Sequence, residues 1–373
     1  MKTLDSFNFK DKVVLLRADL NSDVVRGKIF RNERLWASSE TIRELKKKGA
    51  KVIILAHQGR PRKKDFISMK QHASILKVKF VDGVINKNVE TAIANLKKGD
   101  VILLDNVRRL KEEFIPGKNA LVKFFIGKVD FYVNDAFSVC HRKQTSIVSF
   151  PKYFKSCAGR VLEKEVKALR KINLKKCLYI LGGAKPADNI KLLGKNKVLA
   201  TGFFGQLCLI SRGIKFGGYE KFLKKMLGKE FGVIKNLKGK LGNVLTPIDY
   251  AVNVNGKRKE FLLGEFPNKY IIYDIGEKTI GLFKDEIKKA KAIYVKGPAG
   301  DCSNKNFRKG TVAILKAVSK SKGFSLIGGG HLNDALTISK ISREKFGHVS
   351  LSGGALLRYL AGEKLPGLEA LKL

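Results

Sequence analysis

With 373 residues, 44% of them hydrophobic, the chain is long enough for about two or three domains with substantial cores, and its composition excludes a disordered polymer. It carries 75 Lys and Arg against 33 Asp and Glu, but these charges are spread over many helix-like segments and form no basic arm. Because the sequence has no membrane-spanning apolar run, no apolar signal core and no CxxC pair among its five cysteines, we expect a cytoplasmic protein without a disulfide framework or zinc site.

Short apolar runs rich in Val and Ile recur along the chain, and each is followed by a polar turn and a longer helix-like segment. We expect strands at residues 13–16, 52–56, 101–104 and 131–133 in the first half, and at 178–181, 198–200, 244–245, 270–273, 292–295 and 324–327 in the second. Helix-like segments such as 38–48 and 163–171 lie between them. Continuous apolar strands that alternate with helices predict an α/β fold with parallel sheets covered on both faces.

A domain boundary is expected near residues 151–165, where the chain leaves the first set of strands. Residues 163–170 have the pattern of a linking helix. We therefore predict an N-terminal domain of residues 1–160 and a C-terminal domain of residues 161–350 that includes this helix. No unit of 20–50 residues repeats, which excludes a solenoid.

The residues directly after each predicted strand are the first candidates for function, because ligands of open α/β sheets bind beyond the carboxyl ends of the strands. In the first half they are mainly arginines, histidines and carboxamides, and in the second half they are glycine-rich turns. Arginine recognises phosphate and carboxylate through two parallel hydrogen bonds, whereas glycine turns let backbone N–H groups approach a phosphate chain. The first half therefore suits a small anionic metabolite and the second half a nucleotide. This combination predicts a phosphotransferase.

Lys185 lies where the two halves meet, just past the Gly182-Gly183 turn that ends the apolar run 178–181. A Walker A loop would need Gly-x-x-x-x-Gly-Lys followed by Ser or Thr, and here Pro186 follows the lysine. We therefore expect Lys185 to reach a phosphate group from its own turn, without a loop that wraps the phosphate chain.

The motifs, taken in order, resemble those of the phosphoglycerate kinase family over nearly the whole chain. On the substrate side they are Arg17-Ala-Asp-Leu-Asn21, Asn32-Glu-Arg-Leu35, His57-Gln-Gly-Arg-Pro61, Asp105-Asn-Val-Arg108, and Asn134-Asp-Ala-Phe137 with His141-Arg142. On the nucleotide side they are Leu181-Gly-Gly-Ala-Lys185, Gly297-Pro-Ala-Gly300, Phe307-Arg-Lys-Gly-Thr311, Ile327-Gly-Gly-Gly330, and His348-Val-Ser350 with Gly353-Gly354. Lys364-Leu-Pro-Gly367 resembles the C-terminal signature of the family, and several departures are similar to its archaeal branch.

The resemblance implies two Rossmann-like domains with parallel sheets, joined by a helical hinge and enclosing a substrate cleft. It implies reversible phosphoryl transfer between ATP and 3-phosphoglycerate, with Mg²⁺ accompanying ATP or ADP, by an enzyme that is usually a monomer. The C-terminal tail, from about residue 351 to 373, is expected to return to the N-terminal domain.

The resemblance also assigns roles to particular residues. The substrate-binding set is Asp19, Asn21, Arg34, His57, Gly59, Arg60, Arg108 and Arg142. The nucleotide-binding set is Gly182, Gly183, Lys185, Asn189, Gly297, Gly300, Ser303, Gly328, Gly329, Gly330 and His331. Arg34, Lys185, Gly353 and Gly354 are expected to neutralise charge on the transferred group, which is the main catalytic requirement of phosphoryl transfer. Arg17 is expected to be a structural ion-pair partner.

The departures from the family pattern lie on the nucleotide side. Asn189 occupies the position where many relatives have a second lysine, four residues after the first, and Ser303 replaces a ribose-binding Glu. His331 follows Gly330 where Asp is frequent, so the metal ligands are unknown from the sequence. Loss of a charge-assisted hydrogen bond of roughly 1.5–3 kcal/mol would weaken nucleotide binding by about ten- to a hundredfold if nothing replaced it.

A second hypothesis follows from the positive charge alone. A basic polyanion-binding protein on the same scaffold, with RNA as partner and weakened catalysis, would also carry an excess of lysine. Such a binder has no need of Asp19, Asn21 or His57 in their motif contexts, so the sequence favours the enzyme.

Overall fold

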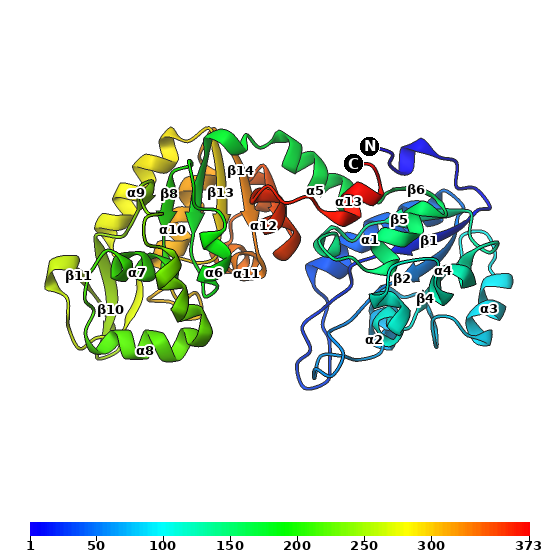
Figure 1. Ribbon diagram of the computed structural model, residues 1–373, viewed down its shortest axis with the longest axis horizontal. Helices are drawn as coiled ribbons and strands as arrows, with labels where there is room; N and C mark the ends of the chain where they lie inside the picture. Colours follow the sequence, from blue (N-terminus) through cyan, green and yellow to red (C-terminus); the bar gives the residue numbers. More distant parts are fainter. The chain divides into compact units, whose positions relative to one another are not determined.

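A computed structural model describes residues 1–329 and 332–373 of the chain (Figure 1). It contains two compact units, and each is described here by itself. Unit 1 comprises Met1–Lys167 with Gly354–Leu373, and unit 2 comprises Ala168–Gly353. The division between them falls inside helix α5 (Arg160–Lys171).

Unit 1 is built on a parallel sheet of six strands in the order β3-β4-β2-β1-β5-β6. The strands are β1 (Val13–Arg17), β2 (Lys51–Leu55), β3 (Lys79–Val81), β4 (Val101–Leu104), β5 (Phe131–Asn134) and β6 (Lys155–Ala158). The four strands predicted in this half are confirmed. The two that were not predicted, β3 and β6, are short strands at the sheet edges, with polar residues that break the apolar pattern.

Helices cover both faces of this sheet. They are α1 (Glu33–Lys47), α2 (Lys70–Leu76), α3 (Lys87–Ala94) and α4 (Ala120–Phe125). Alternate residues of β1 point into two separate cores, because Leu16 packs with α1 and α2 while Leu15 packs with α3 and α4. Helix α1 begins five residues before the predicted start at 38, because the Asn32 side chain accepts hydrogen bonds from the N–H groups of Arg34 and Leu35.

The last part of the chain belongs to unit 1. Helix α12 (Gly354–Leu360) packs against η4 (Phe137–Val139), and α13 (Pro366–Ala370) packs against the π-helical turn η5 (Thr145–Ser149). The N–H of Gly367 donates to the carbonyl of Cys140 at 2.8 Å. The remaining short helices of unit 1 are η1 (Leu4–Ser6), η2 (Val107–Arg109), η3 (Lys111–Phe114) and η6 (Phe150–Lys152).

The first half of helix α5 is tied to unit 1 by an ion-pair cluster. The Arg160 guanidinium lies 2.6 Å from carboxylate oxygens of Asp5 and Glu44 and 2.7 Å from one of Glu163. These hydrogen bonds lower the pKa of Asp5 to about 2. The helix predicted at 163–171 is therefore present, and it begins three residues earlier than expected.

Unit 2 has a parallel sheet of six strands in the order β15-β14-β13-β7-β8-β9. They are β7 (Cys177–Leu181), β8 (Val198–Ala200), β9 (Val244–Leu245), β13 (Ala292–Lys296), β14 (Phe324–Gly328) and β15 (His348–Ser350). Its helices are α6 (Pro186–Ile190), α7 (Gly202–Ser211), α8 (Gly218–Leu227), α9 (Glu277–Lys289), α10 (Lys309–Ser319) and α11 (Gly330–Ser339). Short helices are η7 (Leu174–Lys176), η8 (Gly228–Asn236), η9 (Leu263–Glu265) and η10 (Arg343–Lys345).

A second, antiparallel sheet in unit 2 was not predicted. It contains β10 (Asp249–Val254), β11 (Lys257–Leu262) and β12 (Ile272–Ile275), so the run at 270–273, expected in a parallel sheet, forms part of an antiparallel strand. Strands β10 and β11 are joined by Asn255 and Gly256, both with positive φ. Asn-Gly is the preferred sequence of a two-residue hairpin turn, so the signal was present in the sequence.

Candidate active site

Three loops at the carboxyl ends of the strands of unit 1 meet at Gly59. The backbone N–H of Gly59, after β2, donates to Oδ1 of Asn21, after β1, at 2.7 Å. Its carbonyl accepts a hydrogen bond of 2.5 Å from Nη1 of Arg108, after β4. Two predicted substrate-binding residues, Asn21 and Arg108, are thereby brought together by the backbone of a third, Gly59.

Gly59 is held in a conformation that favours glycine. Its φ is +65°, and a Cβ atom at this position would collide with the backbone of Asp65. The Gln58 side chain reinforces the turn by donating to the carbonyls of Ser22 at 2.8 Å and of Asp65 at 3.1 Å. The glycine in the His57-Gln-Gly-Arg-Pro61 motif is therefore required by close backbone packing.

Asp19 is held by three neighbours of its own unit. Its Oδ2 lies 3.0 Å from Nη1 of Arg34 and accepts a hydrogen bond from the Ser138 hydroxyl, while Oδ1 accepts from the N–H of Asn21 at 3.2 Å. The carboxylate thus orients the Arg34 guanidinium, whose side chain keeps 32% of its surface exposed. Sequence reasoning missed Ser138, although it lies one residue after the quoted Asn134–Phe137 motif.

Arg17 and Glu113 form a fully buried pair beneath these loops, with 4.0 Å between Nη2 and Oε1. The Ser146 hydroxyl joins them, because it accepts from Nε of Arg17 at 2.8 Å and donates to Glu113 at 2.7 Å. Burial raises the pKa of Glu113, and the charge of Arg17 opposes this shift. The expectation that Arg17 is a structural ion-pair partner is confirmed.

His57 is buried beside the same arginine. Nη2 of Arg17 lies 3.1 Å from Nδ1 of His57, and since a guanidinium can only donate, Nδ1 is the acceptor and Nε2 carries the proton. Burial lowers the pKa of His57 well below its usual value, and repulsion from Arg17 and Arg108 lowers it further. His57 is therefore a neutral hydrogen-bond donor at physiological pH.

Arg108 and Arg142 carry buried donors for which the described part of the chain offers no acceptor. These atoms are Nε and Nη2 of Arg108 and Nε of Arg142. Burial lowers the pKa of Arg108 to about 9, and repulsion from Arg17 and Arg142 contributes. The pKa of Arg142 is lowered by burial and by repulsion from Arg60, which is itself exposed. Unpaired buried guanidinium donors are costly, and an anion is the ligand that would satisfy them.

In unit 2, the Gly182-Gly183 turn packs backbone to backbone against the turn after β13. The N–H of Gly182 donates to the carbonyl of Lys296 at 2.7 Å, and that of Gly183 donates to the carbonyl of Pro298 at 3.0 Å. Gly183 and Gly297 have φ values of +76° and +75°. Lys185 follows this turn, exposed, at the N-terminal boundary of α6.

Asn189 is completely buried, and both its Nδ2 and its Oδ1 atoms form hydrogen bonds. Its Nδ2 donates to the carbonyl of Gly182 at 3.0 Å, and its Oδ1 accepts from Nζ of Lys296 at 2.7 Å. Sequence reasoning placed Asn189 among the nucleotide-binding residues and did not mention Lys296, the last residue of β13.

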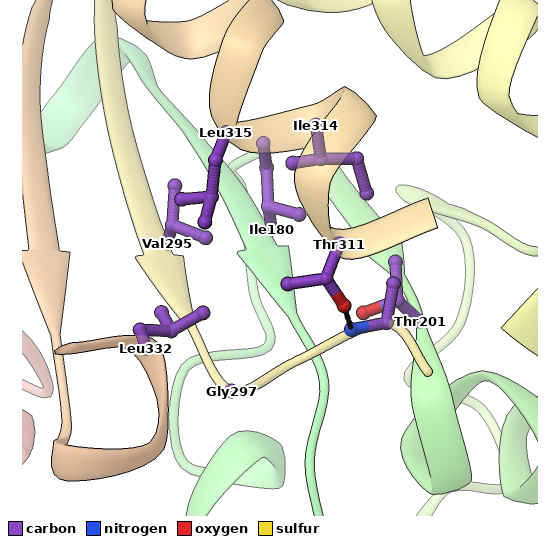
Figure 2. A pocket seen from close by; sticks show the side chains of 9 residues that line it. Ile180, Thr201, Val295, Gly297, Thr311, Ile314, Leu315 and Leu332 are labelled. Atoms are coloured by element: carbon purple, nitrogen blue, oxygen red, sulfur yellow. Dashed lines mark hydrogen bonds between the residues drawn. The ribbon is translucent and has the colours of Figure 1, made fainter. Parts of the chain in front are cut away.

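The turn from Gly297 to Gly300 is held by Thr311, whose Oγ1 accepts from the N–H of Ala299 at 2.9 Å (Figure 2). The same oxygen accepts from the N–H of Gly300 at 3.3 Å. Behind the turn lies a small pocket with mainly apolar walls, lined by Ile180, Thr201, Val295, Gly297, Ala299, Thr311, Ile314, Leu315 and Leu332. Its cavity volume of about 10 Å³ leaves room for about one water molecule, so the pocket cannot hold a nucleotide.

The other predicted nucleotide-side residues are dispersed over three turns. Ser303 is exposed, and its hydroxyl donates to Oδ1 of Asp301 at 2.6 Å. Gly328 ends β14, and Gly329 follows with φ +105° and open space around its Cα. The predictions for Gly330 and His331 concern side chains outside the described residues.

The glycines predicted near the C-terminus are both exposed. A Cβ atom on Gly354 would lie 3.4 Å from the ring of His141, in the same unit. Gly353 has open space on its Cβ side.

Within the part of the chain that the structure describes, no three His, Cys, Asp or Glu side chains cluster as metal ligands, and no helix has both the length and the apolar character of a membrane span.

A two-unit α/β protein with arginine donors at the strand ends of one sheet and a lysine among glycine turns at the other belongs to the class of phosphotransferases. The sequence model described as phosphoglycerate kinase matches residues 4–363. The phosphoglycerate kinase of Methanococcus maripaludis is 41% identical, over 99% of this chain and 97% of its own. The phosphoglycerate kinase of Methanothermus fervidus is 38% identical, over 99% of this chain and 96% of its own. The chain belongs to the phosphoglycerate kinase family.

Solved structures agree with this assignment. The crystal structure of phosphoglycerate kinase from Pyrococcus horikoshii superposes with a TM-score of 0.90 at 34% identity, covering 100% of this chain and 98% of that one. The predicted α/β class with two parallel sheets is confirmed, and these archaeal relatives support the predicted kinship with the archaeal branch of the family. No comparison supports the RNA-binding hypothesis.

Proposed function

We propose that the chain transfers a phosphoryl group reversibly between ATP and 3-phosphoglycerate, giving ADP and 1,3-bisphosphoglycerate. We assign 3-phosphoglycerate binding to unit 1 and nucleotide binding to unit 2. The observation that carries the substrate assignment is the pair of buried Arg108 nitrogens, Nε and Nη2, without an acceptor among the described residues. A phosphate group offers the oxygen acceptors that these donors lack.

In this proposal the 3-phosphate binds Arg108, Arg142, Arg60 and the neutral His57. Repulsion among the arginines, which lowers the pKa of both Arg108 and Arg142, would be relieved by the bound anion. Asn21 and Gly59 keep the loop of Arg108 in place. Asp19 orients Arg34 toward the carboxylate end of the substrate.

The chemical step needs no general base. The attacking group is a carboxylate, which with an ordinary pKa below 4 is already ionised at neutral pH. Its oxygen forms a bond to the γ-phosphorus of ATP while the bond from that phosphorus to the β,γ-bridging oxygen breaks, leaving ADP. The protein therefore contributes mainly alignment and charge neutralisation.

Arg34 of unit 1 and Lys185 of unit 2 are the cations we assign to this neutralisation, together with the backbone N–H groups of Gly353 and Gly354. The glycine turns at 182–183, 297–300 and 328–330 are assigned to the nucleotide, with Ser303 and His331 nearby. Mg²⁺ enters as part of the nucleotide substrate, since it binds phosphate oxygens readily and takes few protein ligands. A cytoplasmic, monomeric enzyme stays a prediction.

A coupled assay with MgATP and 3-phosphoglycerate tests the proposal. We expect turnover in the wild type and a loss of at least a hundredfold in kcat for Lys185→Ala and Arg34→Ala. Matched controls are Lys191→Ala, an exposed lysine six residues on, and Arg43→Ala, an exposed arginine of α1, and both should stay within about twofold of the wild type. A folded wild type without turnover would refute the proposal. Tight RNA binding of steep salt dependence together with that lack of turnover would support the RNA-binding hypothesis.

A further inference from the structure

Lys296 occupies a central position at the carboxyl edge of the sheet of unit 2. It pairs with Leu181 of β7 on one side and with Gly328 of β14 on the other. Both neighbours lead directly into glycine turns, Gly182-Gly183 and Gly329-Gly330. In a parallel α/β sheet this edge is where ligands bind. Lys296 therefore lies between two glycine turns that we assign to nucleotide binding.

The ammonium group of Lys296 is fixed by Asn189. Its Nζ donates to Oδ1 of Asn189 at 2.7 Å, and Nδ2 of the same Asn189 donates to the carbonyl of Gly182 at 3.0 Å. Asn189 is completely buried, so it connects the lysine rigidly to the turn before Lys185. An ammonium has three donors, and among the described residues the structure gives Nζ this one hydrogen bond.

Lys296 forms an ion pair with Asp188, but the pair is longer than a hydrogen bond. Its nearest carboxylate oxygen, Oδ2 of Asp188, is 3.7 Å away, beyond hydrogen-bond distance, and the Asp188 side chain is 37% exposed and already solvated. Burial lowers the pKa of Lys296, the nearby carboxylate of Asp188 opposes this shift, and repulsion from Lys185 adds to it. Two ammonium groups that repel each other beside a glycine turn are an arrangement that a polyanion would stabilise.

We propose that Lys296 is the second phosphate-binding lysine of this enzyme, and that Asn189 positions it. The charge that many relatives carry four residues after the first lysine is supplied here from the neighbouring strand β13. Asn189 is then a positioning residue that does not itself touch the nucleotide. This inference rests on the proposed function, because it takes the α- and β-phosphates of ATP or ADP as the ligand.

The direct test is ADP binding by titration calorimetry, together with the KM values for ATP and 3-phosphoglycerate. Lys296→Met should raise the Kd for ADP and the KM for ATP by about ten- to a hundredfold and leave the KM for 3-phosphoglycerate within about twofold. Lys197→Met is the matched control, because Lys197 also pairs with a carboxylate, at 2.7 Å from Glu286, and lies at the start of β8 at the opposite sheet edge. It should bind ADP like the wild type.

Exchange of the two side chains gives a sharper test. Lys296→Asn alone should bind ADP weakly, and the double variant Asn189→Lys with Lys296→Asn should recover most of the lost affinity. Asn189→Ala should weaken ADP binding in the wild type and have little effect in the Lys296→Met background, because its role acts through the lysine. Equal effects of Asn189→Ala in both backgrounds would overturn the positioning role.

The outcomes distinguish this inference from the proposed function. If the wild type has no turnover with MgATP and 3-phosphoglycerate, the proposed function fails. If the wild type turns over and a folded Lys296→Met binds ADP as tightly as the wild type, only the assignment of Lys296 fails. Should Lys296→Met not fold, Lys296→Arg keeps the charge and changes its geometry, and unchanged ADP affinity there would also overturn a fixed role for the ammonium.

Discussion

Oδ1 of Asn21 accepts a hydrogen bond of 2.7 Å from the backbone N–H of Gly59, which joins the loop after β1 to the loop after β2. The carbonyl of the same Gly59 accepts from Arg108 in the loop after β4. Three sequence-distant segments of unit 1 therefore depend on the conformation of one residue with positive φ.

Gly59→Ala should disrupt substrate binding in unit 1 alone. Left-handed backbone costs a residue with a Cβ roughly 1–2 kcal/mol, and here the new atom also collides with the Asp65 backbone, so the loop must shift. We expect the KM for 3-phosphoglycerate to rise at least tenfold while the Kd for ADP stays unchanged. Gly127→Ala is the control, since Gly127 has φ +80° with open space. It should lower stability without raising that KM, and an equal KM increase in both variants would contradict the prediction.

Arg108→Leu should weaken 3-phosphoglycerate binding. The substitution removes the buried Nε and Nη2 donors that we assign to the 3-phosphate, and it also removes the hydrogen bond from Nη1 to the Gly59 carbonyl. Thermal unfolding should show a smaller rise in Tm on addition of 3-phosphoglycerate than in the wild type.

The neighbouring Arg109 provides the matched control for this experiment. It is half exposed and lies 3.1 Å from Asp105, so Arg109→Leu should cost about 0.2–1 kcal/mol and leave the 3-phosphoglycerate response intact. A Tm response to 3-phosphoglycerate in Arg108→Leu equal to that of the wild type would exclude Arg108 from the anion site.

Asp135→Asn should change the pH dependence of stability. Asp135 is buried, its Oδ1 accepts from the N–H groups of Val161 and Leu162 in α5, and burial raises its pKa from 3.8 to about 7. Between those pH values the folded state holds a proton that the unfolded state has released. Stability therefore falls as pH rises through this range, by up to about 1.4 kcal/mol per pH unit.

The asparagine variant lacks this titration. Its free energy of unfolding should match that of the wild type near pH 4 and exceed it increasingly up to about pH 7. Urea denaturation at several pH values measures the difference. A variant less stable than the wild type at pH 8 would show that the carboxylate gains more from its bonds to helix α5 than it loses by burial.

The strands of both parallel sheets were predictable where they consist of uninterrupted apolar residues, as in Val101–Leu104 and Cys177–Leu181. The edge strands Lys79–Val81 and Lys155–Ala158 were not, because their short, partly polar sequences have no distinct period. The β10–β11 hairpin is a different case, since its Asn255-Gly256 turn was visible in the sequence and was overlooked.

Most candidate residues of unit 1 could be predicted because they follow strands within recognisable motifs, whereas Arg34 lies in a motif at the start of helix α1. Lys296 could not be predicted in this way. Its partner Asn189 lies 107 residues earlier in the chain, and the two meet only because β13 pairs with β7 in one particular register. Comparison with the family motif position by position shows that the second lysine is absent at position 189. It does not show that Lys296, at the end of β13, places an amine beside that position.

The chain order of the two units has a consequence for synthesis. Unit 2 is inserted into unit 1, whose second segment, Gly354–Leu373, is synthesised after all of unit 2. Until then the surface that receives Gly367, formed by Cys140 and Ile147, has no cover. Unit 2 can therefore fold before Gly354–Leu373 is made, whereas unit 1, although begun first, can be completed only once that segment has followed unit 2.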